Sequence, residues 1–322
     1  MFAINDTLKK SAKLMRDVYC EKLIELAFRH ENIVVLDSDL ISSSGMKPFF
    51  QKFPSRAIQC GIAEANMVGI AAGLSGMGKI PFAHSFGCFA ARRACDQIMI
   101  SAAYSKQNVR IIGTDPGITA AYNGGTHMPF EDMGVLRSIP TVTLIEPSDT
   151  VMLSDILEQL CSLRGVYYLR LVRKDTNTIY RDGSRFEIGR GNILVDGRDV
   201  TIIASGIMVF QSFKAATILR TEGISARIVD MFTWKPIDRD IIEDSARKTG
   251  ALVTVENHNT IGGLGSCVAE AVCTGYPVPV EMIGIKDRFG QVGSEDFLRG
   301  EYNLTALDIV AAVRRVVKRK RG

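Results

Sequence analysis

Glu64 is the first candidate for chemistry in this chain. It is the one acidic residue in an apolar segment rich in small residues, CGIAEANMVGIAAGLSGMG, and stands at the front of its predicted helix. Glycines at Gly61, Gly69, Gly73 and Gly76 would let that helix pack very close to another backbone. A lone Glu in a first helical turn usually serves as a partner of the helix dipole. In a tight apolar interface, however, the same carboxyl group is placed to hold a proton for a ligand.

Aromatic and histidine side chains come next along the chain. Phe86 and Phe89, in HSFGCFAARRA, can stack on a flat heterocycle, although core packing is the commoner fate of such residues. His127, in GGTHMPFED, carries the side chain best suited to moving protons near neutral pH. His84, beside the two aromatic residues, is the second choice among the histidines.

An α/β fold must position these residues, because short β-branched runs alternate with longer amphipathic stretches. Near-continuously apolar strands of this kind indicate parallel sheets with helices on both faces. The predicted strands are 33–36, 109–113, 142–145, 167–172, 200–204, 226–230 and 251–256. The predicted helices are 8–29, 63–77, 90–103, 150–163, 209–222, 237–248, 264–273 and 306–318.

The polar, turn-rich stretch 174–191 interrupts this alternation and is the best linker. We therefore expect two α/β domains, residues 1–185 and 186–322, each built on a mainly parallel sheet. A hydrophobic content of 46% with 23% charged residues is ordinary for a globular protein of 322 residues.

The formal net charge of +4 arises from a basic C-terminal tail. Six Lys and Arg residues lie between positions 314 and 321, so the rest of the chain is slightly acidic. A solvated helix end explains such a tail, since cations suit a helix C-terminus. Because the chain outside this tail is slightly acidic, it gives no sign of a nucleic-acid partner.

Cysteine usage and the N-terminus indicate the compartment. Seven cysteines, an odd number without any C-x-x-C pair, argue against a disulfide framework and a zinc site. Polar and charged residues interrupt the N-terminus, so it lacks an apolar signal segment, and no apolar run approaches about 18 residues. We therefore expect a cytoplasmic protein with reduced thiols and no membrane span.

Three segments together resemble the C-terminal half of a transketolase, the part that grips the aminopyrimidine ring of thiamine diphosphate. They are the helix that begins near Glu64, the GGTHMPFED run and the glycine-rich run ENHNTIGGLGSCVAE. The likeness covers almost the whole chain, and its motifs are specific. It implies a pyrimidine-binding domain followed by a transketolase C-terminal domain, in which the glycine-rich run is structural.

The resemblance also implies which residues hold the cofactor. The family's activating glutamate maps onto Glu64, whose carboxyl group would lie against the pyrimidine N1′, while the carbanion chemistry belongs to the cofactor. The family's F-x-x-F pair maps onto Phe86 and Phe89, the second being the ring that packs on the pyrimidine. Asp39, from a D-L-x-x-S motif, and Ile62 would also lie near the cofactor.

Four positions match substrate-binding residues of the family, namely Arg16, Ser43, His127 and Arg173. Two guanidinium groups and a hydroxyl group converging on one site would suit a phosphate dianion, because the planar Arg fork donates paired hydrogen bonds. Taken singly, an arginine is more often a surface charge. His127 would contact the oxygens of the substrate and share the catalytic role with Glu64.

Two residues depart from the family pattern. Asp115 follows Thr114 where the family usually has T-H, and Asn123 replaces the aspartate of the family's E-D-G run. Both positions normally hold hydroxyl and phosphate groups of sugars, so both stay substrate-binding candidates. An Asp in place of a His removes a donor and adds an anion, which disfavours a nearby phosphate. The identity of the sugars is therefore open.

The diphosphate of the cofactor needs a divalent ion, which the family holds with a G-D-G…N motif in a separate N-terminal domain. This chain has no G-D-G motif, and we assign it no metal ligand. The resemblance therefore implies one subunit of a split transketolase, which moves a two-carbon ketol unit between sugars or sugar phosphates. An N-terminal subunit would hold the diphosphate and Mg²⁺ or Ca²⁺ in an α₂β₂ heterotetramer, and the isolated chain would be catalytically silent.

Two other interpretations stay open. The same scaffold serves a β subunit of a 2-oxo acid dehydrogenase or an acyloin-type synthase, although the T-H-M-P-F-E-D and D-R-F-G runs favour transketolase. The other is a non-catalytic paralogue that only assembles with a partner. Intact Glu64, Phe89 and His127 argue against it, whereas Asp115 and Asn123 keep it open.

Overall fold

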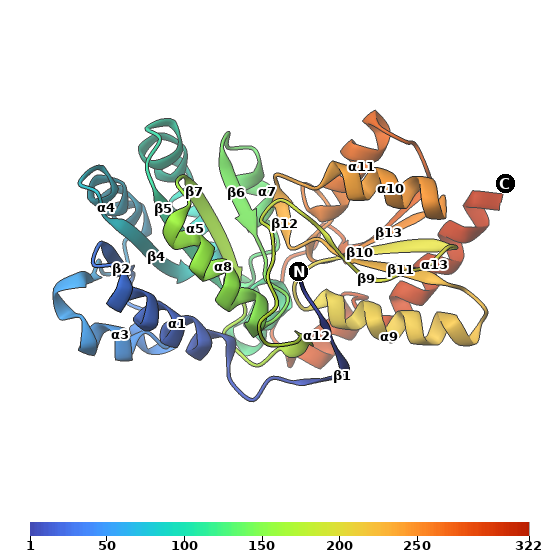
Figure 1. Cartoon of the computed structure of the whole chain (residues 1–322), viewed down its shortest axis with the longest axis horizontal. Helices are drawn as coiled ribbons and strands as arrows, with labels where there is room; N and C mark the ends of the chain where they lie inside the picture. Colours follow the sequence, from blue (N-terminus) through green and yellow to red (C-terminus); the bar gives the residue numbers. More distant parts are fainter. Residues whose placement is uncertain (322) are drawn as a thin grey trace.

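Seven strands form the larger of two mainly parallel sheets in the computed structural model, which describes residues 1–321 except for the side chain of Arg321 (Figure 1). All neighbouring strands run parallel except the first pair in this order. The order is β12 (Thr233–Lys235), β6 (Val142–Ile145), β7 (Val166–Leu171), β5 (Val109–Thr114), β4 (Ile80–Phe86), β2 (Ile33–Asp37) and β3 (Ala57–Gln59).

Five strands form the smaller sheet, which lies beside the first (Figure 1). Its last strand is antiparallel to its neighbour and the others are parallel. The order is β14 (Val280–Ile285), β13 (Leu252–Asn259), β10 (Val200–Ala204), β11 (Ala226–Asp230) and β9 (Asn192–Val195).

Helices cover both faces of each sheet, because the strands are apolar on both sides. In β2, Ile33 and Val35 belong to one core cluster, whereas Val34 and Leu36 belong to another. The first cluster takes in α1 (Met15–Arg29), α8 (Thr150–Ser162), α9 (Met208–Thr221) and α13 (Ala306–Arg321). The second takes in α4 (Glu64–Gly76), α5 (Gly87–Arg92), α7 (Asp132–Arg137), α10 (Arg239–Thr249) and α11 (Leu264–Thr274). The predicted fold class is confirmed.

Short elements make up the remainder of the regular structure. They are α2 (Ile41–Ser44), α3 (Lys47–Lys52), α6 (Cys95–Gln97), α12 (Glu295–Glu301), the 3₁₀ turns Pro54–Arg56, Gly117–Asn123 and Gly125–His127, and a π-helical segment, Ile98–Tyr104.

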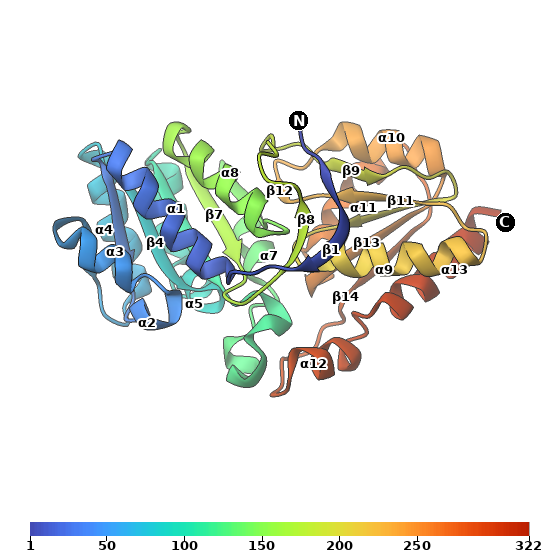
Figure 2. The ribbon, with the colours of Figure 1, turned by 60° about the horizontal axis from the view of Figure 1, so that its bottom comes forward.

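Two predicted helices are wrong in extent. The helix predicted from residue 8 begins only at Met15, because the preceding residues form β1 (Ile4–Lys10), which pairs antiparallel with β8 (Asn177–Tyr180) (Figure 2). The helix predicted for 90–103 is interrupted after Arg92 and continues as α6 and the π-helical segment. Within the two mainly parallel sheets, the strands that were not predicted are β3, β4, β9, β12 and β14.

The chain crosses between the two sheets after the expected boundary at residue 185. Strand β12 adds to the edge of the larger sheet although its residues lie in the second half of the sequence. The Asn257 side chain accepts a hydrogen bond from Ile118 N–H at 3.0 Å and donates one to the carbonyl of Pro116 at 2.8 Å. The two halves are therefore joined by side-chain contacts as well as by the covalent linker.

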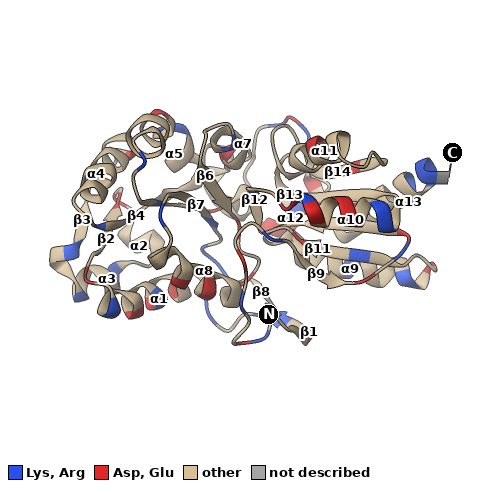
Figure 3. Ribbon diagram, turned by 45° about the horizontal axis from the view of Figure 1, so that its top comes forward, with Lys and Arg blue, Asp and Glu red and all other residues tan. Residues whose placement is uncertain are grey.

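The basic tail forms the last turns of α13 (Figure 3), and three of its arginines pair with acidic residues. Arg314 pairs with Glu222, and Arg315 and Arg319 both pair with Glu281. The side chain of Arg321, also part of the predicted tail, lies outside the described residues. Among the helices of residues 1–321, none combines the length and the apolar character needed to cross a bilayer.

Candidate active site

Most candidate residues follow the carboxyl ends of neighbouring parallel strands in the larger sheet. Asp39 comes after β2, Phe86 ends β4, Asp115 follows β5 and Arg173 follows β7. These four strands are neighbours in the sheet and run parallel, so their ends meet at one edge. Ligands of open α/β sheets bind at such an edge.

Glu64 is the first residue of α4 and its side chain is 2% exposed. Ser85 Oγ donates a hydrogen bond to Glu64 Oε1 at 3.1 Å. One terminal nitrogen of Arg93 faces both carboxylate oxygens, at 3.3 and 3.1 Å. Buried carboxylates need such partners, and the N-terminus of α4 adds a favourable dipole. The predicted acid group is therefore held at the start of its helix by two donors.

Phe86, Phe89 and His127 form an aromatic cluster beside Glu64. The ring of His127 lies edge-on to both phenylalanines, with centroids 5.7 Å from Phe86 and 5.2 Å from Phe89. Its Nδ1 is 2.9 Å from the hydroxyl of Thr126. Because β4 leads directly into α5, both phenylalanines lie next to Ser85, and the structure brings these predicted residues together.

The Arg93 guanidinium joins Glu64 to this cluster. Its central carbon lies 4.0 Å from the centroid of the Phe89 ring, a cation–π contact. The Arg93 side chain is 47% exposed, whereas its carboxylate partner is buried. No sequence pattern pointed to this arginine, because a single Arg on a helix is usually a surface charge.

Asp115 and Arg173 form a second ion pair at the same edge. Arg173 Nε lies 2.6 Å from Asp115 Oδ2, but their geometry does not make an aligned hydrogen bond. The Arg173 guanidinium also lies over the Phe86 ring, 5.0 Å from its centroid. Burial raises the pKa of the Asp115 carboxyl, although the charge of Arg173 opposes that rise. Asp115, one of the departures from the family pattern, thus neutralises a predicted anion-binding residue.

Arg16 and Ser43 are in contact through the backbone of Ser43, whereas their predicted role in binding a phosphate stays a prediction. A terminal nitrogen of Arg16 donates to the Ser43 carbonyl at 2.9 Å. Arg16 Nε is buried and has no hydrogen-bond partner in the described chain. A hollow of about 480 Å³ beside them is lined by Asp39, Leu40, Ile41, Ser42, Ser43, Lys47, Phe50, Gln51 and Gln59.

Three predicted residues are exposed. Asp39, held in a left-handed conformation at φ 64°, and Asn123 lie at the surface, and Ile62 is 73% exposed. A side chain added at Gly61 or Gly69 would meet nothing within 4 Å in the described residues. The close packing predicted for α4 is therefore not made within this chain.

His84 and Asp37 form a buried pair that sequence reasoning did not connect. His84 Nδ1 lies 3.7 Å from Asp37 Oδ2, and neither ring nitrogen has a hydrogen-bond partner in the described chain. Burial, aided by the charge of Arg173, lowers the pKa of His84 to about 3. Burial raises the pKa of Asp37 to about 6, although the N–H of Leu40 donates to it. The histidine is neutral near pH 7.

A buried polar network lies between the two sheets. Arg170 donates to Asp132 at 3.0 Å, to Glu146 at 2.6 Å and to the carbonyls of Pro129 and Asn257 at 2.8 and 3.1 Å. Every charged group of this network is fully or almost fully buried. It joins the loop that carries His127 to strand β13.

Polar side chains of the glycine-rich run form hydrogen bonds with backbone N–H groups of this chain. Glu256 accepts N–H bonds from Leu264 and Gly265, at 2.6 and 2.8 Å, and so caps α11. Burial raises the pKa of Glu256 to about 8 and lowers that of His258 to about 4. His258 Nε2 accepts a hydrogen bond from Gly134 N–H at 3.2 Å. These contacts fit a structural role for the run.

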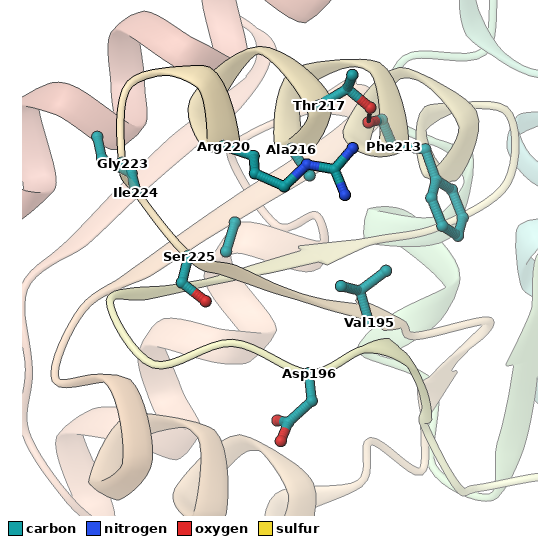
Figure 4. Close-up of a pocket in the computed structure, with 10 residues that line it drawn as sticks. Val195, Asp196, Phe213, Ala216, Thr217, Arg220, Gly223, Ile224 and Ser225 are labelled. Carbon is teal, nitrogen blue, oxygen red and sulfur yellow. Dashed lines mark hydrogen bonds between the residues drawn. The ribbon is translucent and has the colours of Figure 1, made fainter.

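A further hollow lies away from the candidate site. This hollow of about 440 Å³ lies between α9 and β9 on the smaller sheet, where Arg220 and Asp196 are its charged residues (Figure 4). No group of three His, Cys, Asp or Glu side chains suited to a metal ion occurs within residues 1–321.

Family comparisons agree with this geometry. Residues 11–178 match the transketolase pyrimidine-binding domain, and residues 189–309 match the transketolase C-terminal domain. This chain belongs to the transketolase family.

Relatives of about the same length match nearly end to end. The 6-deoxy-6-sulfo-D-fructose transketolase subunit SqwH of Clostridium sp. (strain MSTE9) is 47% identical over 95% of each chain. A putative transketolase C-terminal section of Methanocaldococcus jannaschii is 43% identical over 96% of this chain and 98% of its own. A solved split-gene transketolase, an inactive beta4 tetramer, is 44% identical, covers 96% of this chain and 99% of its own, and superposes with a TM-score of 0.89. The chain is thus the C-terminal part of a thiamine-diphosphate-dependent transketolase.

The residues present fit the pyrimidine half of thiamine diphosphate. A buried carboxylate beside a partly exposed aromatic ring offers one hydrogen-bonding group and one stacking surface, the two contacts that a flat aminopyrimidine needs. The fit does not extend to the metal ion of the cofactor, for which residues 1–321 hold no group of His, Cys, Asp or Glu ligands.

Proposed function

We propose that this chain works as the C-terminal subunit of a two-chain transketolase, with a separate N-terminal subunit that holds the diphosphate and a divalent ion. The observation that carries the proposal is the buried Glu64 carboxylate beside Phe89 at the carboxyl edge of the sheet. When bound, thiamine diphosphate supplies the carbanion chemistry that breaks the C2–C3 bond of a ketose. The two-carbon ketol unit then joins the aldehyde carbon of an acceptor sugar.

The residues of this chain would bind, orient and move protons. Glu64 would hold a proton on the pyrimidine N1′, and Phe89, backed by Phe86, would hold the face of that ring. Ile62, exposed beside Glu64 in sequence, would add an apolar contact when the partner closes the site. His127 would take and return the proton of a substrate hydroxyl group.

The proposed substrate site would carry less positive charge than it would if Arg16 and Arg173 were both unpaired. Asp115 neutralises Arg173, so Arg16 and Lys47 are left as the cations near Ser43, and Asp17 lies 3.6 Å from Arg16 Nε. A singly charged sulfo group would fit that balance better than a phosphate dianion, and one relative is named for 6-deoxy-6-sulfo-D-fructose. We therefore propose a sulfo sugar or a sugar phosphate as donor, with Asp39 and Asn123 at the rim of the site.

Assembly with the partner would complete the enzyme. The uncovered glycine face of α4 and the exposed Ile62 suit a closely packed second chain, and we propose an α₂β₂ heterotetramer in the cytoplasm. The inactive beta4 tetramer of a split-gene transketolase supports the proposal that this chain alone is silent.

Reconstitution tests this function. The chain is co-expressed with the product of an adjacent reading frame that carries G-D-G…N, and ketol transfer is measured with thiamine diphosphate and Mg²⁺. We expect Glu64→Gln to lower kcat about 100-fold or more while assembly is kept. The matched control is Glu21→Gln, an exposed carboxylate on α1 that pairs with Lys13.

Three outcomes would contradict the proposal. A pair that assembles without any transfer, with no effect of Glu64→Gln, would identify a non-catalytic paralogue. Decarboxylation of a 2-oxo acid instead of ketol transfer would identify the dehydrogenase-like alternative. Ordinary ketol transfer by the chain alone would remove the need for a partner.

A further inference from the structure

Arg93 contacts both the Glu64 carboxylate and the Phe89 ring, the two groups that a bound pyrimidine would need. One of its terminal nitrogens is 3.1 and 3.3 Å from the two oxygens of Glu64, so a single N–H donor faces the carboxylate. Its guanidinium lies over Phe89 at 4.0 Å from the ring centroid. A flat, cationic group thus stacks on the aromatic ring and hydrogen-bonds the buried acid at the same time.

The ion pair also gives the buried Glu64 carboxylate a partner when no cofactor is bound. A carboxylate that is 2% exposed is costly without a charged or polar partner, and Ser85 supplies only one neutral hydrogen bond. Arg93 supplies the missing positive charge. Among the described residues its guanidinium has no other carboxylate partner within ion-pair distance.

We propose that Arg93 is a displaceable stand-in for the cofactor, which occupies the pyrimidine position until thiamine diphosphate binds and then swings out to solvent. The inference rests on the proposed function of Glu64 and Phe89. It predicts that the cofactor competes with the chain's own arginine, so the apparent dissociation constant exceeds the intrinsic one by the inverse of the open fraction.

The position of Arg93 allows this exchange. The residue is the C-cap of α5, where the regular helix gives way to α6 and the π-helical segment. Its side chain is 47% exposed, so the guanidinium needs only to rotate into water. Only the Glu64 end of this pair is buried, so water or a ligand can replace the guanidinium, and displacing it costs less than breaking a pair with two buried partners.

Cofactor binding to the assembled enzyme tests the inference. Thiamine diphosphate is titrated with Mg²⁺ into the wild-type assembly and the Arg93→Ala and Arg93→Lys assemblies, and dissociation constants are measured by calorimetry. We expect Arg93→Ala to tighten binding about three- to tenfold, and Arg93→Lys to fall between, because lysine keeps the charge but lacks the plane. The control is Arg92→Ala, since Arg92 is 48% exposed and pairs with Glu131.

The outcomes separate this inference from the proposed function. An unchanged or weaker affinity in Arg93→Ala, with normal binding by the wild type, would overturn the inference alone. Equal tightening by Arg92→Ala would also overturn it, because loss of any nearby cation would then suffice. A wild-type assembly that binds no thiamine diphosphate would remove the proposed function and this inference together.

The pairing of Arg93 with Glu64 can also be tested in the isolated chain, without an activity measurement. The isolated chain is treated with an arginine-specific dicarbonyl, and modification of Arg93 is followed by peptide mass spectrometry in wild type and Glu64→Gln. We expect Glu64→Gln to speed modification of Arg93 severalfold and leave Arg92 unchanged, since only Arg93 loses its carboxylate. Equal rates at Arg93 in the two proteins would contradict the pairing.

Discussion

Two regions of the molecule pair carboxylates with arginines in opposite ways. At the joint between the sheets, Arg170 is fully buried and donates to two carboxylates and two backbone carbonyls. At the carboxyl edge of the larger sheet, Arg93 offers one nitrogen to Glu64 and leaves half of its side chain in water. The first arrangement gives each of the three guanidinium nitrogens a protein acceptor, and the second leaves most of the donors to solvent.

The difference indicates what each region does. A buried pair is strongly destabilised when one partner is removed, because the other charge stays in a low-dielectric interior. A pair with one half-exposed partner costs less to break, because water or a ligand can take the place of that partner. We therefore expect the Arg170 network to stay intact and the Arg93–Glu64 pair to be exchangeable.

Arg170→Ala should give the largest effect. We expect it to lower the free energy of unfolding by about 3–5 kcal/mol, because Asp132 and Glu146 would be left as buried, unpaired carboxylates. Urea unfolding followed by circular dichroism measures this change. Arg170→Lys serves as the control that keeps the charge but cannot reach four partners. A loss below about 1 kcal/mol for Arg170→Ala would break the contrast between the two regions.

The strands that carry the fold could be predicted because their β-branched runs are apolar on both faces. Strand β4 escaped because Pro81, His84 and Ser85 interrupt its apolar pattern, although all of its residues are buried. Strand β1 escaped for another reason. Its pairing with β8 joins residues about 170 positions apart, and no local propensity reports such a contact.

Asp115→Asn should give an intermediate effect at the same edge. Loss of the carboxylate frees Arg173 for substrate, so we expect the KM for a phosphorylated ketose to fall about tenfold. Steady-state kinetics of the reconstituted enzyme measure this, with an unphosphorylated ketose as the control substrate whose KM should not change. Equal changes for both substrates would mean that Asp115 acts on the fold and not on the anion.

Motif spacing could predict most candidate residues of the site but not their pairing. Parallel strands that end at one edge bring Phe86, Asp115 and Arg173 together, as the order of the sheet requires. The ion pair that links the latter two depends on rotamers and on the left-handed backbone of Asp115, at φ 59°. Arg93 carried no signal at all, since a helix-end arginine has the same sequence signature whether it is free or bound to a buried acid.

Arg93→Ala should have the smallest effect on the isolated chain. Removing a half-exposed guanidinium costs the pair itself, which is worth about 0.2–1 kcal/mol, and water can then reach Glu64 through the opening. We expect a change in the free energy of unfolding below about 1 kcal/mol, measured by the same urea titration as for Arg170→Ala. A loss as large as that of Arg170→Ala would show that Glu64 is as sealed as Asp132. A sealed carboxylate could not exchange its arginine for a cofactor, so the same result would also argue against displacement at the edge.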